Sequence, residues 1–300
     1  MPTPLHKTQD AQTGEEIAST TIPPEAPAAN GSPPKRNAFT ALMTPKKPPS
    51  TDPMPPKIPP SSTPHTDPAL STTFLRRDGL GAYIASPSSF PSSRVIYHDD
   101  KWVLIRDLFP KSSIHLLLLP RDPGKQLLHP FEAFKDGAFL EEVKGEVRKV
   151  KRLVGKELGR VFGGESVRER ERRRAVEEMG DDADEEEVAK RLPPARDWAK
   201  DVISGIHIGP SMNHLHIHIL SKDMHSECMK HRKHYNSFQT PFLVDVEDFP
   251  LGEEDDRRHY GRERYLEWEL KCWRCGRGFG NRFARLKEHL EGEFEEWRRE

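Results

Sequence analysis

The feature that most constrains the fold of this chain is a run of seven residues in which histidine alternates with apolar residues, His214-Leu215-His216-Ile217-His218-Ile219-Leu220. This period of two predicts a β-strand over residues 212–220, with three imidazoles on one face and apolar side chains on the other. A row of imidazoles is poor core material, because each ring has an N–H and an acceptor to satisfy. The pattern favours phosphate chemistry with a histidine nucleophile. A chance arrangement and a metal site are alternatives, but carboxylate and cysteine ligands are missing nearby.

The segments before this run predict an α+β domain. Strand patterns occur at residues 95–97, 102–107 and 114–120, and the last is apolar on both faces, as in a central strand. Apolar spacing predicts a short helix over 74–84, weakened by two glycines, and a long amphipathic helix from Phe131 to Val161. We expect an antiparallel sheet that carries the histidines, with helices packed to one side and a small module after it.

Two polar regions flank or interrupt this domain. Residues 1–70 contain 17 of the 28 prolines and predict a disordered tail, because so few apolar side chains cannot offset the entropy of ordering. Residues 163–197 look like an insertion, in which a basic block is followed by eight carboxylates in the eleven positions 177–187. Such blocks are normally solvated. The domain is predicted to span 71–222, with the insertion inside it, and a basic extension with a second module is predicted to span 223–300.

Within the tail, Phe39, Leu42 and Met43 share one face of a short helix and are flanked by basic residues. This island predicts a binding segment for a protein partner or a nuclear import signal, and a chance cluster explains it equally well.

No run reaches the roughly 18 apolar residues of a membrane span, and the N-terminus lacks the apolar stretch of a secretory signal. We therefore expect no membrane partner. Three cysteines indicate a reducing compartment rather than a disulfide framework.

The C-terminal module has the spacing of a zinc finger. Cys272 and Cys275 are followed after thirteen residues by His289, and Glu293 comes one helical turn later on the same face. These four side chains predict one structural zinc ion with tetrahedral coordination. A water or another side chain as fourth ligand, or a CxxC without metal, are the alternatives, because carboxylate is a less usual structural ligand.

The segment from Arg257 to Lys287 has an excess of Lys and Arg over Asp and Glu, interleaved with aromatic residues. Cations beside aromatic rings are typical of surfaces that follow a nucleic-acid backbone and stack on bases. For Trp273 and Phe279 we expect the other role of such rings, which is to pack the finger against the preceding domain.

Residues 214–220 match the motif of the histidine-triad family, His-Φ-His-Φ-His-Φ-Φ with Φ apolar, at every position. Residues 105–115 resemble the nucleotide-binding strand pair of this family, and Gly209 to Met212 resembles its phosphate-contacting turn. Residues 221–226 and 233–238, together with the zinc module, resemble the aprataxin branch of the family. The resemblance covers residues 74–300 apart from the insertion. It implies a nuclear DNA repair hydrolase that removes AMP from 5′-adenylated DNA ends left by abortive ligation.

The resemblance also implies roles for individual residues. His216 is the expected nucleophile, which forms a covalent histidyl-AMP while its other ring N–H binds the carbonyl of His214. His218 lines the phosphate, and His225 binds or protonates the leaving phosphate. Asp107 is expected to hold the ribose. The other substrate-binding residues implied by the resemblance are Lys111, His115, Ser211, Lys233 and His234.

Two other functions remain open from the sequence. One is a general histidine-triad hydrolase or phosphoramidase that acts on small adenylates, which would have no use for the basic finger. The other is a non-catalytic zinc-finger protein that binds DNA as a scaffold, which would not need a row of imidazoles.

Overall fold

The computed structural model describes residues 77–179, 186 and 190–300. The tail predicted over 1–70, with Phe39, Leu42 and Met43, lies outside the described residues. No helix in the described part of the chain is both long and apolar enough to cross a membrane.

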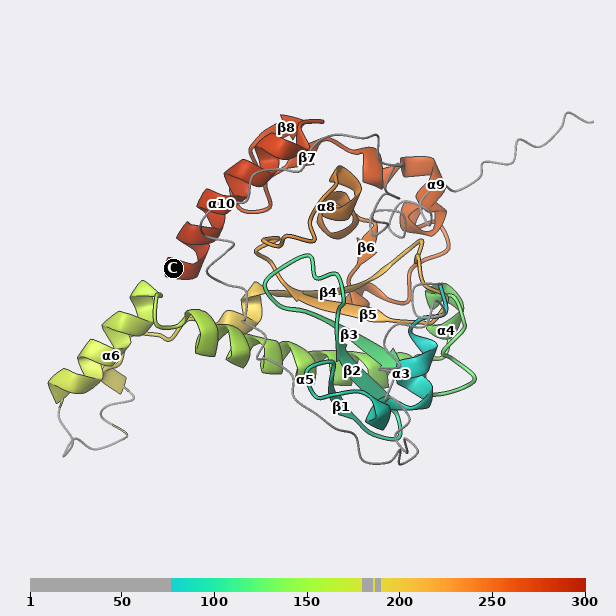
Figure 1. The fold of residues 1–300 in the computed structure, drawn as a ribbon, viewed down its shortest axis with the longest axis horizontal. Helices are drawn as coiled ribbons and strands as arrows, with labels where there is room; N and C mark the ends of the chain where they lie inside the picture. Colours follow the sequence, from blue (N-terminus) through green and yellow to red (C-terminus); the bar gives the residue numbers. More distant parts are fainter. Residues whose placement is uncertain (1–76, 180–185, 187–189) are drawn as a thin grey trace, which may run out of the picture. The chain divides into compact units, whose positions relative to one another are not determined.

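The core of the described chain is a six-stranded antiparallel sheet with the strand order β1-β2-β3-β5-β4-β6 (Figure 1). The strands are β1 (Val95–His98), β2 (Trp102–Arg106), β3 (His115–Pro120), β4 (Val202–His207), β5 (Ile217–Ser221) and β6 (Leu243–Val244). All five residues of β5 are buried, because the strand lies between β3 and β4. The antiparallel sheet with its helices confirms the α+β class.

One face of the sheet is covered by α5 (Gly137–Phe162). Its apolar stripe, which includes Val143, Val147 and Val154, packs with Leu118 and Ile217 in one buried cluster. A single helix was predicted from Phe131, but the structure separates a short α4 (Pro130–Ala133) from α5. The Asp136 side chain accepts hydrogen bonds from the backbone N–H groups of Ala138 and Phe139, and this N-cap starts the second helix.

The other face of the sheet carries two short helices, α3 (Gly81–Ala85) and α8 (Arg232–Gln239). Leu80, Tyr83 and Ile84 pack on β1–β3, while Tyr235 and Phe238 of α8 pack beside Leu220 of β5. The helix predicted over 74–84 was therefore too long within the described residues, since 77–80 form a turn and α3 starts at Gly81. Two glycines in that stretch lower its helical propensity.

The triad strand is also shorter than predicted, because β5 begins at Ile217. His214 and His216 lie in the segment that leads into the strand. The backbone explains the difference: the N–H of Asn213 binds the carbonyl of Arg77, and that of Leu215 binds the carbonyl of Gln126. These donors therefore bind distant loops rather than a neighbouring strand.

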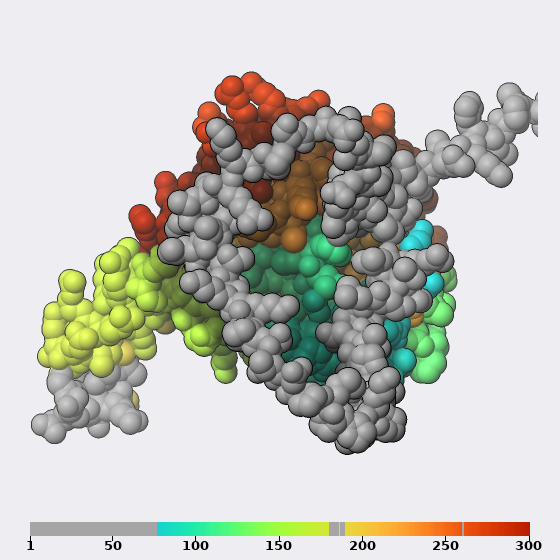
Figure 2. Space-filling model, in the orientation of Figure 1, coloured from blue at the N-terminus to red at the C-terminus, as the bar shows by residue number. Residues whose placement is uncertain are grey.

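The charged insertion contains α6 (Val167–Met179), none of whose residues is buried. In Figure 2 this yellow-green helix stands out from the rest of the domain. The end of the predicted insertion is different. Arg196 is buried, with its guanidinium 3.7 Å from the centre of the Trp198 ring and 5.3 Å from that of Trp297. It donates to the carbonyl of Trp297 and to Asp201, so this residue belongs to the packed core.

The C-terminal module consists of β7 (Leu270–Lys271), β8 (Gly278–Gly280) and α10 (Phe283–Arg299). Leu270, Phe279, Leu286 and Leu290 form its buried core, which is continuous with residues of α8. The second half of α10 packs Phe294 and Trp297 against Phe162 of α5 and Trp198 of η4. Short helical turns connect these elements: η3 (Pro87–Ser89), η4 (Trp198–Asp201), η5 (Val246–Asp248), η6 (Asp256–His259), α9 (Tyr260–Glu263) and η7 (Tyr265–Glu267).

Candidate functional site

Four imidazoles from three strands and one loop gather on the α8 side of the sheet. We call His115, His207, His216 and His218 the histidine cluster. The ring of His218 has its centre 4.3 Å from that of His207, 4.9 Å from that of His216 and 5.2 Å from that of His115. Phe238 of α8 packs edge-on against His218 at 5.1 Å. The cluster is therefore built by strand pairing and closed by one aromatic ring.

His216 is oriented by the backbone just before it. Its Nδ1 lies 2.7 Å from the carbonyl oxygen of His214, so Nδ1 carries the proton and donates it. The lone pair is then on Nε2, as the family resemblance implied. Burial lowers the pKa of His216, and this effect outweighs the opposite effects of the His214 carbonyl and of Asp107. A neutral ring with a free Nε2 is a competent nucleophile at neutral pH.

A chain of hydrogen bonds sets the protons of the next two rings. The backbone N–H of Lys111 donates to Nδ1 of His115 at 3.1 Å, so the proton of His115 is on Nε2. Nε2 of His115 lies 2.9 Å from Nδ1 of His218 and donates to it. The proton of His218 is consequently on Nε2, a buried atom that has no hydrogen-bond partner among the described residues. This arrangement presents an unused N–H donor beside the nucleophile.

The same bonds argue against a metal in this cluster. Ligand atoms of Asp107, His115 and His218 lie within 4.8 Å of one another, which is close enough for a shared ion. A neutral imidazole binds a metal through one nitrogen and keeps its proton on the other. Nδ1 of His115 already accepts from Lys111, so Nε2 must keep the proton and is not available as a ligand.

Burial keeps the whole cluster uncharged. It lowers the pKa of His115 to about 4, although Asp107, with a carboxylate oxygen 3.6 Å from Nε2, acts in the opposite direction. The pKa values of His207 and His218 are lowered well below the usual range by burial, and the neighbouring imidazoles add to the effect. The cluster therefore offers neutral ring nitrogens and N–H donors rather than positive charges.

The predicted binding residues at the β2–β3 connection lie around the cluster. Asp107 accepts a hydrogen bond from the backbone N–H of Phe109, which fixes its carboxylate. Lys111 is buried and its ammonium donates to the carbonyl of Phe109 at 2.7 Å. Ser211 lies in the loop between β4 and β5.

Three predicted residues lie on the extension after β5. Lys233 is exposed in the first turn of α8, and the Nδ1 of His234 accepts from the backbone N–H of Lys230. Burial lowers the pKa of His234 to about 4, and the Lys111 charge adds to this effect. The ring of His225 stacks on Phe294 at 4.1 Å, and its Nε2 lies 2.8 Å from Glu291. His225 thus contacts α10, and its role at the phosphate stays a prediction.

Two residues of the site were missed by sequence reasoning. His207 enters the cluster because β4 pairs with β5, where Gly205 lies opposite His218 and His207 follows on the same face. The signal was a histidine within an apolar strand next to the turn at 209–212. Asp223 is fully buried and accepts from the backbone N–H groups of Ser113 and His225 and from the Ser221 hydroxyl. It fixes the chain directly after the triad.

The segment before α3 is attached to the segment before His216. Nε of Arg77 donates to the Asn213 side chain at 3.0 Å, and the amide of Asn213 donates to Asp78 at 2.7 Å. A Cβ at Gly81 would lie 2.8 Å from Cε1 and Nε2 of the His214 ring. A side chain at position 81 would therefore displace the ring of the residue whose carbonyl orients His216.

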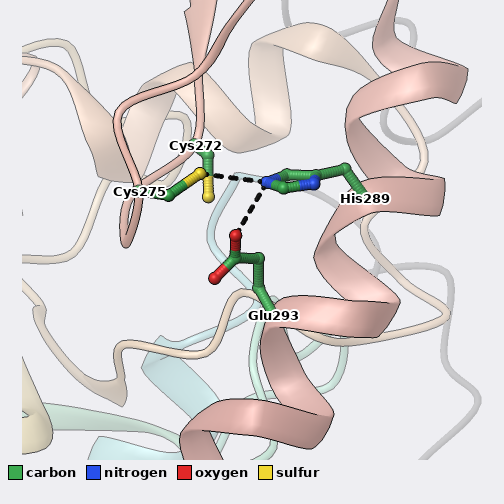
Figure 3. Close-up of side chains that lie close together, drawn as sticks. All are labelled: Cys272, Cys275, His289 and Glu293. Atoms are coloured by element: carbon green, nitrogen blue, oxygen red, sulfur yellow. Dashed lines mark hydrogen bonds and ion pairs between the residues drawn. The ribbon is translucent and has the colours of Figure 1, made fainter.

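The C-terminal cluster has the four side chains that the spacing predicted. Cys272 and Cys275 lie on the turn between β7 and β8, and they face His289 and Glu293 of α10 (Figure 3). Nε2 of His289 lies 3.2 Å from Sγ of Cys275 and 3.0 Å from Oε1 of Glu293, and all four ligand atoms lie within 4.8 Å of one another. Two sulfurs, one imidazole and one carboxylate fit a tetrahedral zinc site.

Part of the basic segment is neutralised within the protein. Arg257 pairs with Asp248 and Asp255, and Arg264 pairs with Glu267. Arg258 donates to the carbonyls of Leu251 and Gly252, and six further cations of the segment make no ion pair with a described carboxylate, namely Arg262, Lys271, Arg277, Arg282, Arg285 and Lys287. Trp273 and Phe279 pack in the core, as expected, whereas Trp268 is 43% exposed.

Comparison with known proteins agrees with this geometry. Residues 91–225 match the HIT domain family, and residues 239–296 match the C2HE / C2H2 / C2HC zinc-binding finger. An aprataxin-like protein of Schizosaccharomyces pombe is 36% identical over 221 residues, which are 74% of this chain and 82% of that protein. An aprataxin-like protein of Saccharomyces cerevisiae is 35% identical, and the match covers 73% of this chain and 95% of that protein.

Solved structures give the same result. The crystal structure of the aprataxin ortholog Hnt3 in complex with DNA matches with a TM-score of 0.57 and 34% identity, over 74% of this chain and 96% of that one. Hnt3 in complex with DNA and guanosine matches with a TM-score of 0.55 and 33% identity, over the same shares of the two chains. The histidine-triad domain, the C2HE finger and these relatives together show that the chain belongs to the aprataxin-like family of histidine-triad proteins.

Proposed function

We propose that this protein is a nuclear hydrolase that removes AMP from the 5′ end of adenylated DNA. The observation that carries the proposal is the pair of atoms at the cluster: the free Nε2 of His216 and the unpartnered Nε2–H of His218. A nucleophile and a donor in contact suit the attack on a phosphate, where charge develops on non-bridging oxygens.

The reaction proceeds in two displacements. Nε2 of His216 attacks the phosphorus of AMP, a P–N bond forms, and the P–O bond to the DNA 5′-phosphate breaks. Water then attacks the histidyl-AMP, the P–N bond breaks, and AMP leaves. During both steps the carbonyl of His214 holds the Nδ1 proton and stabilises the charge that develops on the ring. The N–H of His218 binds a phosphate oxygen.

The surrounding residues bind the two parts of the substrate. Asp107 holds the ribose hydroxyls, while Lys111, Ser211, Lys233 and His234 form the polar surroundings of the phosphates. His115 acts through His218 rather than at the phosphate, because both of its ring nitrogens are already bonded. His225 stabilises the leaving phosphate from the edge next to α10.

We assign DNA binding to the basic segment and the C-terminal finger. One structural zinc ion held by Cys272, Cys275, His289 and Glu293 would fix the turn to α10 and stabilise the finger. The six cations without an ion pair, with the exposed Trp268, provide phosphate contacts and a stacking surface. Such contacts make binding tolerant of sequence and weaker at high salt.

The decisive experiment compares two substrates for the same protein. We expect AMP release from nicked 5′-adenylated DNA to have a much higher kcat/KM than AMP release from a small AMP amidate. A preference for the small amidate would instead identify a general nucleotide hydrolase. Tight binding of adenylated DNA without AMP release would identify a scaffold and contradict the proposal.

A further inference from the structure

The zinc-site turn contains an arginine whose side chain reaches the carboxylate ligand. Arg274 lies between the two cysteines, and its Nη1 is 2.8 Å from Oε2 of Glu293. The same guanidinium contacts Glu296 at 2.7 Å and also Glu300, on the following turns of α10. Arg274 is half-buried, and the Glu293 side chain is 9% exposed.

The two oxygens of Glu293 have separate partners. Oε1 lies 3.0 Å from Nε2 of His289, on the side of the cysteine sulfurs, while Oε2 is bound to Arg274. The carboxylate is therefore held with one oxygen toward the ligand cluster and the other away from it. A free glutamate would rotate about its side-chain bonds and lose this orientation.

Charge gives the arginine a second effect. Two thiolates and one carboxylate place three negative charges around a divalent cation, which leaves a net charge of minus one in a partly buried site. A buried carboxylate without a partner is costly, and a guanidinium with its planar set of donors compensates it well. A second histidine in place of Glu293 would be a neutral ligand, whereas Glu293 adds a negative charge. The positive charge of Arg274 offsets it.

We propose that Arg274 is a positioning residue of the metal centre, which holds Glu293 with Oε1 toward the other three side chains, where it would act as the fourth ligand. Groups that bind metal ligands from outside typically change metal affinity by about 10- to 100-fold when they are removed. The competing explanation is that Arg274 forms an ordinary surface ion-pair network with Glu296 and Glu300, worth little for the metal.

The test measures zinc affinity of the full-length protein by competition with a chromogenic chelator. Arg274→Ala is expected to weaken zinc binding by about 10- to 100-fold. Arg274→Lys keeps the charge without the planar donors, so we expect a smaller loss. The double variant Glu296→Ala/Glu300→Ala removes the outer partners and should leave zinc affinity nearly unchanged. Arg277→Ala is the matched control, because Arg277 lies in the same turn, with its guanidinium over Phe279.

Cobalt loading gives a readout that a merely structural role would not move. In Arg274→Ala the visible bands that report coordination geometry should shift, while the sulfur charge-transfer absorption stays, because both thiolates remain. Unchanged zinc affinity in Arg274→Ala, or an equal loss in the Glu296→Ala/Glu300→Ala variant, would overturn the proposal. If Arg274→Ala fails to fold, the Arg274→Lys variant decides: an affinity equal to that of the unaltered protein contradicts it.

Discussion

The two chemical centres of this protein both use histidine, in opposite ways. In the histidine cluster the rings are kept neutral, His115 and His218 are bonded to each other, and His115 and His216 are bonded to the backbone. In the proposed metal centre the His289 ring faces a sulfur and a carboxylate, an arrangement that a bound zinc ion would complete. The rings of the histidine cluster are positioned by the folded sheet, whereas zinc binding at the C-terminal site would itself stabilise the finger.

Because of this difference, we expect substitutions in the two centres to have different effects. Within the cluster, His115 fixes the proton of His218 and the His214 carbonyl fixes that of His216, so a substitution there should change chemistry more than folding. At the metal centre the ligands are spread over a turn and a helix, so loss of the ion should change folding and DNA binding more than chemistry.

The largest effect should follow the loss of the nucleophile. His216→Ala removes the atom that bonds to phosphorus, and we expect AMP release to fall by on the order of 10⁴-fold or more. The thermal unfolding temperature should change little. Turnover close to that of the unaltered protein would show that another group performs the attack.

The second substitution tests the hydrogen-bonded chain. In His115→Ala the Nδ1 of His218 loses its donor, so the tautomer of His218 is no longer fixed and kcat should fall by about a hundredfold. KM for DNA should remain similar. His115→Gln retains a donor near the position of Nε2 and should recover part of the activity. A loss confined to KM would instead support direct contact between His115 and the substrate.

The neutral state of the cluster predicts a dependence of stability on pH. The unfolded chain takes up a proton at His115 below about pH 6.5, whereas the folded protein does so only near pH 4. Unfolding therefore binds a proton at His115 in this window, and the contribution of His115 to the free energy of unfolding should decrease by about 3 kcal/mol as the pH falls from 6.5 to 4. Urea unfolding at several pH values measures this, and the decrease should be smaller in His115→Gln.

Metal removal should affect the other centre. In Cys275→Ser we expect zinc binding to be lost and DNA affinity to fall by about tenfold, because phosphate contacts on the finger are no longer held in place. Turnover of the small AMP amidate should be largely retained. An equal loss for both substrates would show that the two centres are not separable.

The smallest expected effect concerns the approach of α3 to the cluster. Gly81→Ala places a methyl group against the His214 ring, which must shift, and we expect the His214 carbonyl to move with it. We expect kcat to fall by about three- to tenfold through misorientation of His216. Gly252→Ala is the control, because a Cβ there meets no atom within 4 Å.

A feature of the structure could be predicted from the sequence when the residues that form it lie close together along the chain. The triad and the zinc ligands were predictable, because their spacing along one strand or one helix turn carries the chemistry. His207 was not, because it reaches the cluster through the pairing of β4 with β5. The start of β5 was misplaced for the same reason, since Asn213 and Leu215 donate to distant loops.

Burial of charged residues was equally hard to predict from local composition. Arg196 lies in a stretch that reads as solvated, yet it is enclosed by Trp198 and by Trp297, which is 101 residues away. A local window contains one of these two rings. The final strand order likewise depends on long-range packing rather than on the pattern of any single segment.

Helix α10 contains two of the proposed zinc ligands, the Glu291 that binds His225, and the Trp297 carbonyl held by Arg196. Zinc binding and docking of this helix are therefore reciprocally coupled: whatever factor the ion adds to the docking equilibrium, docking adds to zinc affinity. A weakened contact at Arg196 would be measured as a weaker zinc site, although no ligand has changed. Zinc supply would in turn set the fraction of molecules in which the DNA-binding surface is held beside the catalytic histidines.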